Sequence, residues 1–208
     1  MLTAYMHTSR ADGHKFILKY IHPINFEDLQ EVNNRLEGNA NHVRLAVDAI
    51  PDKSMFVFEH FTDHLLTLAQ RDLPLVVVKR ILKNALTGLA ELHDQDVVHT
   101  GTSCCFLSFS PPPILDNNLP PIDIKADNVL INWHGNDEII IDKVQLGDLE
   151  DAAHIPAGCD MVGKQAGNWM WRSPEAHARG PVNKPSDIFS FALVVSPIQT
   201  FLKHKHSW

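Results

Sequence analysis

The sequence predicts one domain of the α+β class, in which strands and helices occupy separate stretches of the chain rather than alternating. Three patterns indicate this class. Strand-like segments crowd around one helix in residues 1–61, a long amphipathic helix spans Leu75 to His93, and a strand pair occupies residues 128–146. The length of 208 residues suits a single domain of ordinary size, and no internal repeat is visible.

Composition and charge exclude several classes of function. Hydrophobic residues make up 44% and charged residues 21% of the chain, which is the balance of a globular protein with a core. The formal net charge of −7 offers no basic surface to a phosphate backbone, so nucleic acid is not an expected partner. No window approaches the roughly 18 apolar residues of a membrane span, and the N-terminus lacks a leader pattern. We therefore expect no membrane partner and a cytoplasmic or nuclear location.

Cysteine and histidine usage indicates neither a disulfide framework nor a metal centre. Cys104, Cys105 and Cys159 are too few and too irregularly spaced for a framework, and no Cys-x-x-Cys pair suggests zinc. The 13 histidines are scattered along the chain, so a solvated or core role is the simpler interpretation for each of them. A reducing compartment fits this pattern best.

The first 61 residues predict a strand, a helix and two further strands. Lys15 to Ile21 combines β-branched and aromatic residues, and no strand is expected before it. Phe26 to Leu36 has apolar residues at helical spacing. Two more strand-like runs, His42 to Ala49 and Ser54 to Phe61, are separated by a turn at Pro51-Asp52.

The later elements surround a segment without a clear period. A buried helix is predicted from Leu75 to His93, because apolar side chains recur there at helical spacing. Its stripe comprises Val78, Ile81, Leu82, Ala85, Leu86, Leu89 and Leu92. Residues 101–122 are rich in Pro, Ser and Cys and match neither helix nor strand, so we interpret them as an insertion. Asn128 to Trp133 and Glu138 to Leu146 predict a strand pair around a turn at residues 134–137.

Four short motifs follow one another along the chain. The first is split by the insertion and reads Val97-Val98-His99-Thr100, then Asp123-Ile124-Lys125-Ala126-Asp127-Asn128. The others are Leu146-Gly147-Asp148-Leu149-Glu150, GNWMWRSPE at residues 167–175 and DIFSFA at residues 187–192. In this order they resemble the catalytic loop, the metal motif, the end of the activation segment and the following helix of eukaryotic-type serine/threonine protein kinases.

The resemblance implies a two-lobed protein-kinase-like fold. Residues 1–61 would form an incomplete, β-rich N-lobe with the hinge, and residues 62–195 a partial, mostly helical C-lobe that carries the insertion at 101–122. The tail at residues 196–208 has no counterpart in the family, which continues with further helices. We therefore expect a truncated C-lobe.

The resemblance also assigns the residues of phosphoryl transfer, which needs a carboxylate for the hydroxyl proton and oxygen ligands for magnesium. Asp123 matches the catalytic base, and Lys125, a feature of the serine/threonine branch, can reach the transferred phosphoryl group. Asn128 and Asp148 match the magnesium ligands. ATP and magnesium are the implied cofactors, and the implied acceptor is a serine or threonine hydroxyl of an unidentified protein substrate.

Upstream residues match the nucleotide-binding half of the family's site. Lys19 resembles the lysine that contacts the α- and β-phosphates, and Glu31 is its expected ion-pair partner, with Glu37 as a rival. The hinge would bind adenine through the backbone of Glu59 and Phe61. A solvated charge would explain Lys19 or Glu31 taken alone, and an edge strand would explain the hinge.

The chain departs from the family pattern at several positions. No Gly-x-Gly-x-x-Gly precedes Lys19, Thr100 replaces the arginine before the base, and Glu150 replaces the glycine after the metal aspartate. Residues 149–172 contain no Ser, Thr or Tyr that could accept a phosphate. Two alternatives therefore stay open: a catalytically inactive, pseudokinase-like binding module, and a small-molecule phosphotransferase, against which residues 171–175 argue.

Two explanations of residues 101–122 also stay open. We favour a retained intron, because the segment separates His99 from Asp123, which a catalytic loop holds close together. The residues at Gly101 and Val195 permit codons that form splice donors, and Leu115 permits a codon series like a fungal branch site, which suggests a fungal-like kinase. The alternative is a genuine lineage-specific loop.

Overall fold

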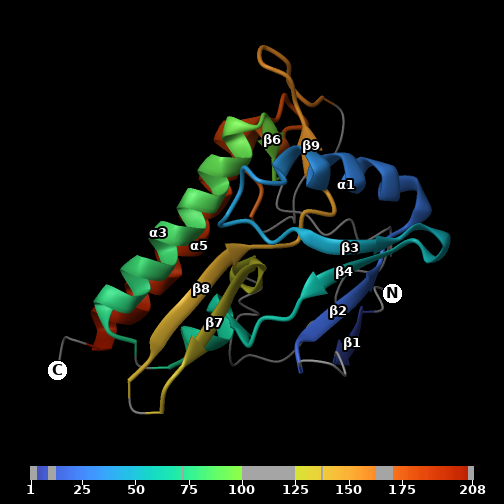
Figure 1. The fold of residues 1–208 in the computed structure, drawn as a ribbon. Helices are drawn as coiled ribbons and strands as arrows, with labels where there is room; N and C mark the ends of the chain where they lie inside the picture. Colours follow the sequence, from blue (N-terminus) through green and yellow to red (C-terminus); the bar gives the residue numbers. More distant parts are fainter. Residues whose placement is uncertain are drawn as a thin grey trace, which may run out of the picture.

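The computed structural model describes residues 4–8, 13–71, 73–99, 125–136, 138–162 and 171–205 of the chain. The predicted insertion at residues 101–122 lies outside the described residues, as does Asp123. The described part combines helices with small antiparallel sheets, as expected for an α+β chain (Figure 1). This architecture is compatible with a partial protein-kinase fold.

A four-stranded antiparallel sheet is formed by the N-terminal part of the chain. Its strands are β1 (Ala4–Thr8), β2 (Lys15–Tyr20), β4 (Met55–Glu59) and β3 (Ala46–Ile50), in that spatial order. Strand β2 is central and pairs Ile17 with Phe58, which places Lys19 beside Phe56. The strands at the positions of β2 and β4 are confirmed, whereas β1 contradicts the prediction that no strand precedes Lys15. Its five residues are too few to show a convincing strand period.

The predicted strand at residues 42–49 begins later than expected. Strand β3 starts at Ala46, because the preceding residues pair with the second sheet instead. The Arg44 amide donates to the Leu146 carbonyl at 2.8 Å, and the Leu146 amide donates to the His42 carbonyl at 2.7 Å. Residues 42–44 thus join the two sheets.

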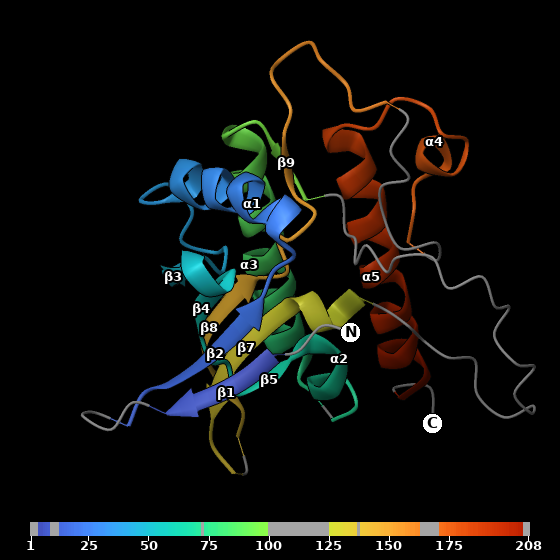
Figure 2. The same cartoon turned by 90° about the vertical axis from the view of Figure 1, so that its right-hand side faces the viewer.

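Helix α1 (Pro23–Leu36) packs against the four-stranded sheet (Figures 1 and 2). Proline at its first position needs no amide partner, and the His22 side chain accepts a hydrogen bond from the Ile24 amide at 3.3 Å. Phe26 stacks on Phe56 of β4 with ring centroids 4.5 Å apart. The helix therefore has a fixed apolar face toward the sheet.

The second sheet has the order β5 (Asp63–His64), β7 (Val129–His134), β8 (Ile140–Leu146). The β7–β8 pair confirms the predicted hairpin, with Val129 opposite Leu146. Shorter elements complete the described chain. They are η1 (Pro51–Lys53), α2 (Leu65–Leu68), β6 (Val97–Val98), η2 (Lys125–Asn128), β9 (Ala153–His154) and α4 (Pro174–His177).

Two long helices, α3 (Leu75–Asp94) and α5 (Lys184–Lys205), lie side by side (Figure 1). The predicted stripe of α3 is largely buried, but Leu86 is 45% exposed because it lies one position past the buried Ala85. Helix α5 continues through residues 196–205, where the sequence shows no family resemblance. No helix in the described ranges is long and apolar enough to cross a membrane.

Helix α3 approaches the segment between α1 and β3 closely at Gly88. Glu91 accepts hydrogen bonds from the His42 amide at 2.7 Å and contacts the His42 ring at 2.8 Å. A Cβ atom on Gly88 would overlap the carbonyl group of His42. The missing side chain therefore permits the contact that joins α3 to the first half of the chain.

Substituting Gly88→Ala is expected to destabilise the protein by about 1–3 kcal/mol, because backbone atoms cannot rotate away from the added methyl group. In an exposed helix position the same change stabilises by up to about 1 kcal/mol, so the sign itself is diagnostic. Urea denaturation measures the effect, with Thr87→Ala on the exposed side of the same helix as control. An unchanged or raised free energy of unfolding for Gly88→Ala would contradict the close contact.

Candidate active site

Lys19 on β2 and two carboxylates that follow β8 form an ion cluster between the two sheets. The Lys19 Nζ lies 2.9 Å from Asp148 Oδ1 and also contacts the Glu150 carboxylate. The three side chains are 17–23% exposed, so the cluster is mostly shielded from water. Lys19 and Asp148, which are 129 positions apart in sequence, are thereby brought together.

Burial and charge act in opposite directions on this cluster. Burial lowers the pKa of Lys19, but the charges of Asp148 and Glu150 outweigh it, so the net pKa is raised. Burial raises the pKa of Glu150 despite its contact with Lys19. At neutral pH Lys19 is therefore protonated and stays paired with the two carboxylates.

Asp148 has a backbone conformation that few residues adopt. Its φ of 64° lies in the left-handed region, which costs free energy for a side chain other than glycine, although Asp tolerates it better than most residues. Both backbone polar groups of the preceding residue, Gly147, are hydrogen-bonded. The Gly147 amide donates to the Asn128 carbonyl at 2.8 Å, and the His99 ring donates from Nε2 to the Gly147 carbonyl at 2.9 Å.

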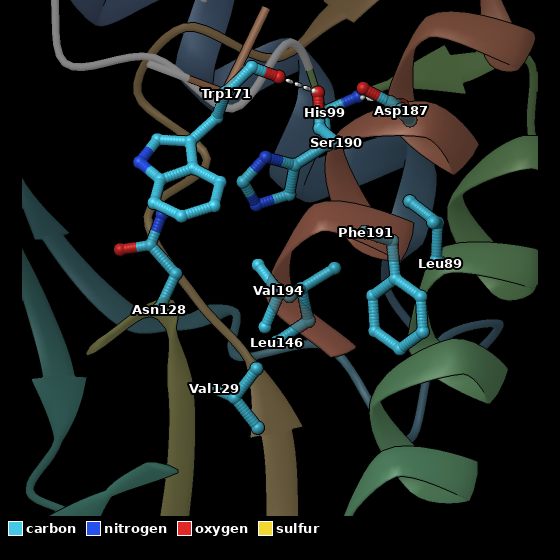
Figure 3. Close-up of a pocket in the computed structure, with 10 residues that line it drawn as sticks. All are labelled: Leu89, His99, Asn128, Val129, Leu146, Trp171, Asp187, Ser190, Phe191 and Val194. Carbon is cyan, nitrogen blue, oxygen red and sulfur yellow. Dashed lines mark hydrogen bonds between the residues drawn. The ribbon is translucent and has the colours of Figure 1, made fainter. Parts of the chain in front are cut away.

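A buried aspartate on α5 fixes the chain that leads into the predicted catalytic loop. Asp187 accepts hydrogen bonds from the His99 amide at 2.8 Å and from His93 Nε2 at 3.0 Å. Figure 3 shows Asp187 and His99 in contact at the upper end of a pocket. Through His99 and Gly147, α5 is connected to the backbone of Asp148.

The pocket in Figure 3 has Asn128 on one side and α5 on the other, with a volume of about 60 Å³. Its walls are mainly apolar, with Leu89, Leu146 and Val194 among them. Asn128 ends the short helix η2, which also contains the backbone of Lys125. Asp123 and the side chain of Lys125 lie outside the part of the structure that is described. Their roles stay predictions.

The residues present fit a magnesium ion in their donor chemistry. Asn128 and Asp148 offer an amide and a carboxylate oxygen, which are ligands that Mg²⁺ prefers. Their backbones are joined through Gly147. Among the described residues no group of three or more His, Cys, Asp or Glu side chains could hold a metal. Magnesium at nucleotide sites commonly takes only one or two protein carboxylates and completes its shell with phosphate and water.

The predicted ion pair between Lys19 and Glu31 is not present in the structure. Glu31 faces solvent with 67% of its side chain exposed and lies 4.0 Å from Arg35, one helical turn away. Its rival Glu37 is exposed at the end of α1. The α1 residues that line the small pocket of Lys19 are Leu29 and Asn33. Helical spacing places residues 29 and 33 on one face and residue 31 on another.

Asn33 cannot replace the missing carboxylate, because its amide group is already used. Its Nδ2 donates to the Leu29 carbonyl at 2.8 Å, and its Oδ1 accepts from the Ala46 amide at 2.8 Å. The Glu150 carboxylate supplies the second negative charge beside Lys19 instead.

The predicted hinge is bound by an arginine to which the sequence analysis assigned no role. Arg44 donates from Nε and Nη2 to the Glu59 carbonyl at 3.0 and 2.5 Å. The Glu59 side chain points elsewhere and pairs with Lys143 at 2.6 Å. Phe61 is buried, with the Lys143 ammonium 5.4 Å from its ring centroid. The Glu59 carbonyl is thus already bound by the Arg44 guanidinium.

Sequence reasoning missed the roles of Arg44 and Glu150. A charged residue within the apolar run VRLAV is a signal of a buried pairing, because buried arginines require acceptors. Glu150 was noted only as a replacement for glycine. Its partner lies on β2, and nothing in local spacing connects the two.

The segment that resembles the end of an activation segment is anchored to α5. Ser190 donates to the Trp171 carbonyl at 2.6 Å, and Ser173 is buried at the start of α4. Ser186 donates to the Glu175 carboxylate, and this bond lowers the pKa of Glu175. Ser186 on α5 is therefore a hydrogen-bond partner of Glu175.

Strand order, the Lys19–Asp148 pair and the anchored loop are together compatible with a kinase-like domain. Comparison with known proteins supports this class. The chain is 26% identical over 157 residues to the probable serine/threonine-protein kinase PBL26 of Arabidopsis thaliana, which covers 72% of this chain and 32% of that protein. It is 30% identical over 78 residues to the probable serine/threonine-protein kinase roco7 of Dictyostelium discoideum, which covers 38% of this chain and 3% of that protein.

These similarities are distant and partial. The chain spans about a third or less of the length of the two curated relatives. No protein-family model matches it. The similarity supports a kinase-like domain related to serine/threonine protein kinases, and neither relative supports the fungal-like interpretation.

Proposed function

We propose that the chain is a protein-kinase-type domain that transfers the γ-phosphoryl group of a magnesium-bound purine triphosphate, ATP by the resemblance, to a serine or threonine hydroxyl. The observation that carries the proposal is the Lys19–Asp148 pair at 2.9 Å. It joins a cation for the phosphates to a carboxylate for the metal across two sheets. A two-lobed arrangement with a hinge near residue 61, a protein substrate and a cytoplasmic or nuclear location belong to the same proposal.

Each residue of the site would have one task. Magnesium, when bound by Asn128 and Asp148, would neutralise charge that develops on the phosphate oxygens. Lys19 would hold the α- and β-phosphates, and Lys125 the transferred group. Asp123 would orient the attacking hydroxyl and accept its proton.

Nucleotide binding with and without magnesium tests this proposal directly. Titration calorimetry of the whole chain should show binding of a purine triphosphate that chelation of Mg²⁺ weakens. Transfer of radiolabelled γ-phosphate to serine and threonine peptides, but not to tyrosine peptides, is the matching activity assay. Absence of binding under all conditions would refute the proposal.

A non-catalytic binding module is the second candidate, favoured by one observation. Lys19 and the Glu59 carbonyl, which a nucleotide would use, both have partners from the chain itself, namely Glu150 and Arg44. In a module of this kind the cluster would be structural. The calorimetry above separates the two candidates, since only the first requires magnesium-dependent binding.

Activity is expected to be independent of phosphorylation in the activation segment. Residues 149–172 contain no hydroxyl side chain, and Thr100 stands where the family places the arginine that reads a loop phosphate. Phosphatase treatment of protein purified from eukaryotic cells should therefore leave the transfer rate unchanged. A large loss of rate, with a phosphate mapped by mass spectrometry to this segment, would overturn the expectation.

A further inference from the structure

Arg44 binds the backbone carbonyl of Glu59, which in the proposed function would face the base of the nucleotide. Both Nε and Nη2 donate to the Glu59 carbonyl, the acceptor that an adenine amino group would need in the proposed function. A backbone carbonyl has two lone pairs, and Arg44 already donates two hydrogen bonds to this one, so it is a poor acceptor for a further donor.

The guanidinium is largely buried and packs against two aromatic rings. Its central carbon lies 4.9 Å from the ring centroid of Phe58 and 5.9 Å from that of Phe61. Arg44 shares a cavity of about 20 Å³ with Lys19 and Asp148, so it belongs to the same site as the ion cluster. Burial lowers the pKa of Arg44 to about 10, which leaves it charged at neutral pH.

The remaining hydrogen-bond capacity of Arg44 consists of donors alone. A guanidinium carries five N–H groups and no acceptor. Within the described part of the chain, Arg44 makes no side-chain hydrogen bond other than those to Glu59. An amino group of a base at this position would face the N–H donors of Arg44 without forming a hydrogen bond. A carbonyl group of a base would accept a hydrogen bond from them. Arginine pairs with guanine O6 and N7 for this reason in nucleic-acid recognition.

We propose that Arg44 determines base specificity and that the site prefers purine triphosphates with a 6-oxo group, such as ITP and GTP, over ATP. The inference rests on the proposed function and refines its phosphoryl donor. ITP is the sharpest probe, because it differs from ATP at position 6 of the ring and its N1 proton, while sugar and phosphates are the same.

Titration calorimetry of the whole chain with Mg-ITP, Mg-GTP and Mg-ATP tests the proposal. We expect ITP to bind at least about tenfold more tightly than ATP, the discrimination typical of one arginine–base contact. Arg44→Met should lose this preference, with tighter binding of ATP and weaker binding of ITP. Arg71→Met is the matched control, since the Arg71 guanidinium lies 4.6 Å from the Trp133 ring, on a different aromatic partner. Thermal melts show that each variant folds.

The outcomes separate this inference from the proposed function. Equal or tighter binding of ATP by the native chain, or an ITP-to-ATP ratio that Arg44→Met leaves unchanged, overturns the role of Arg44 while the kinase-type site stands. No binding of any of the three nucleotides, by the native chain or by Arg44→Met, overturns both.

Discussion

Asp148→Asn is expected to abolish magnesium-dependent function of the chain. Asparagine keeps the shape of the side chain but removes the negative charge that pairs with Lys19 and that, in the proposed function, would hold the metal. Loss of one group that stabilises developing charge typically costs about 10²–10³-fold in rate. We therefore expect phosphoryl transfer to fall by at least about a hundredfold and the affinity for a purine triphosphate to stop depending on Mg²⁺.

Asp142→Asn is the matched control for this substitution. Asp142 is on β8, the strand that precedes Asp148, but it is 47% exposed and pairs with His134 at 2.9 Å. It should leave binding and transfer unchanged. Full magnesium-dependent binding by Asp148→Asn would show that Asp148 is not a magnesium ligand. Circular dichroism verifies that both variants are folded.

Elements with a strong local period could be predicted from the sequence. The stripe from Val78 to Leu92 predicted α3, and alternation around a turn predicted the β7–β8 pair, because one face of each element is buried. The five-residue strand β1 lacked enough length to show its period. The late start of β3 could not be predicted either, since residues 42–44 pair with Leu146, about a hundred positions later.

The candidate site was predictable only through the order of its motifs. Periodicity alone would not connect Lys19 with Asp148, which come from separate sheets. Resemblance connected them, and it also led to Glu31, whose place on the exposed side of α1 keeps it from Lys19. Glu150 departs from the family pattern, and the resemblance assigned no role to Arg44. Residues of that kind determine how an individual site differs from its relatives, and tertiary contacts alone reveal them.

Excision of Gly101 to Ile122 is expected to raise activity. The flanking chain is well anchored, because His99 is bound to Asp187 and Gly147 and the backbone resumes in η2 at Lys125. Joining Thr100 directly to Asp123 shortens the connection between these anchors. Closing the shorter loop costs about 1–2 kcal/mol less conformational entropy. The shortened chain should therefore be more stable by about 1–2 kcal/mol, and in the proposed function it should also transfer phosphate faster, because only Thr100 then separates His99 from Asp123.

Two measurements decide whether the segment is native. The shortened chain is compared with the full chain in denaturation and transfer assays, and a chain in which residues 101–122 are replaced by a Gly/Ser linker of equal length is the control for loop length. Messenger RNA is sequenced in parallel. Transcripts that uniformly retain the codons for Gly101 to Ile122, together with a loss of activity on excision, would refute the retained intron and identify a genuine loop. Transcripts that lack these codons, with higher activity of the shortened chain, would show that the continuous sequence Val-Val-His-Thr-Asp-Ile-Lys is the functional catalytic loop.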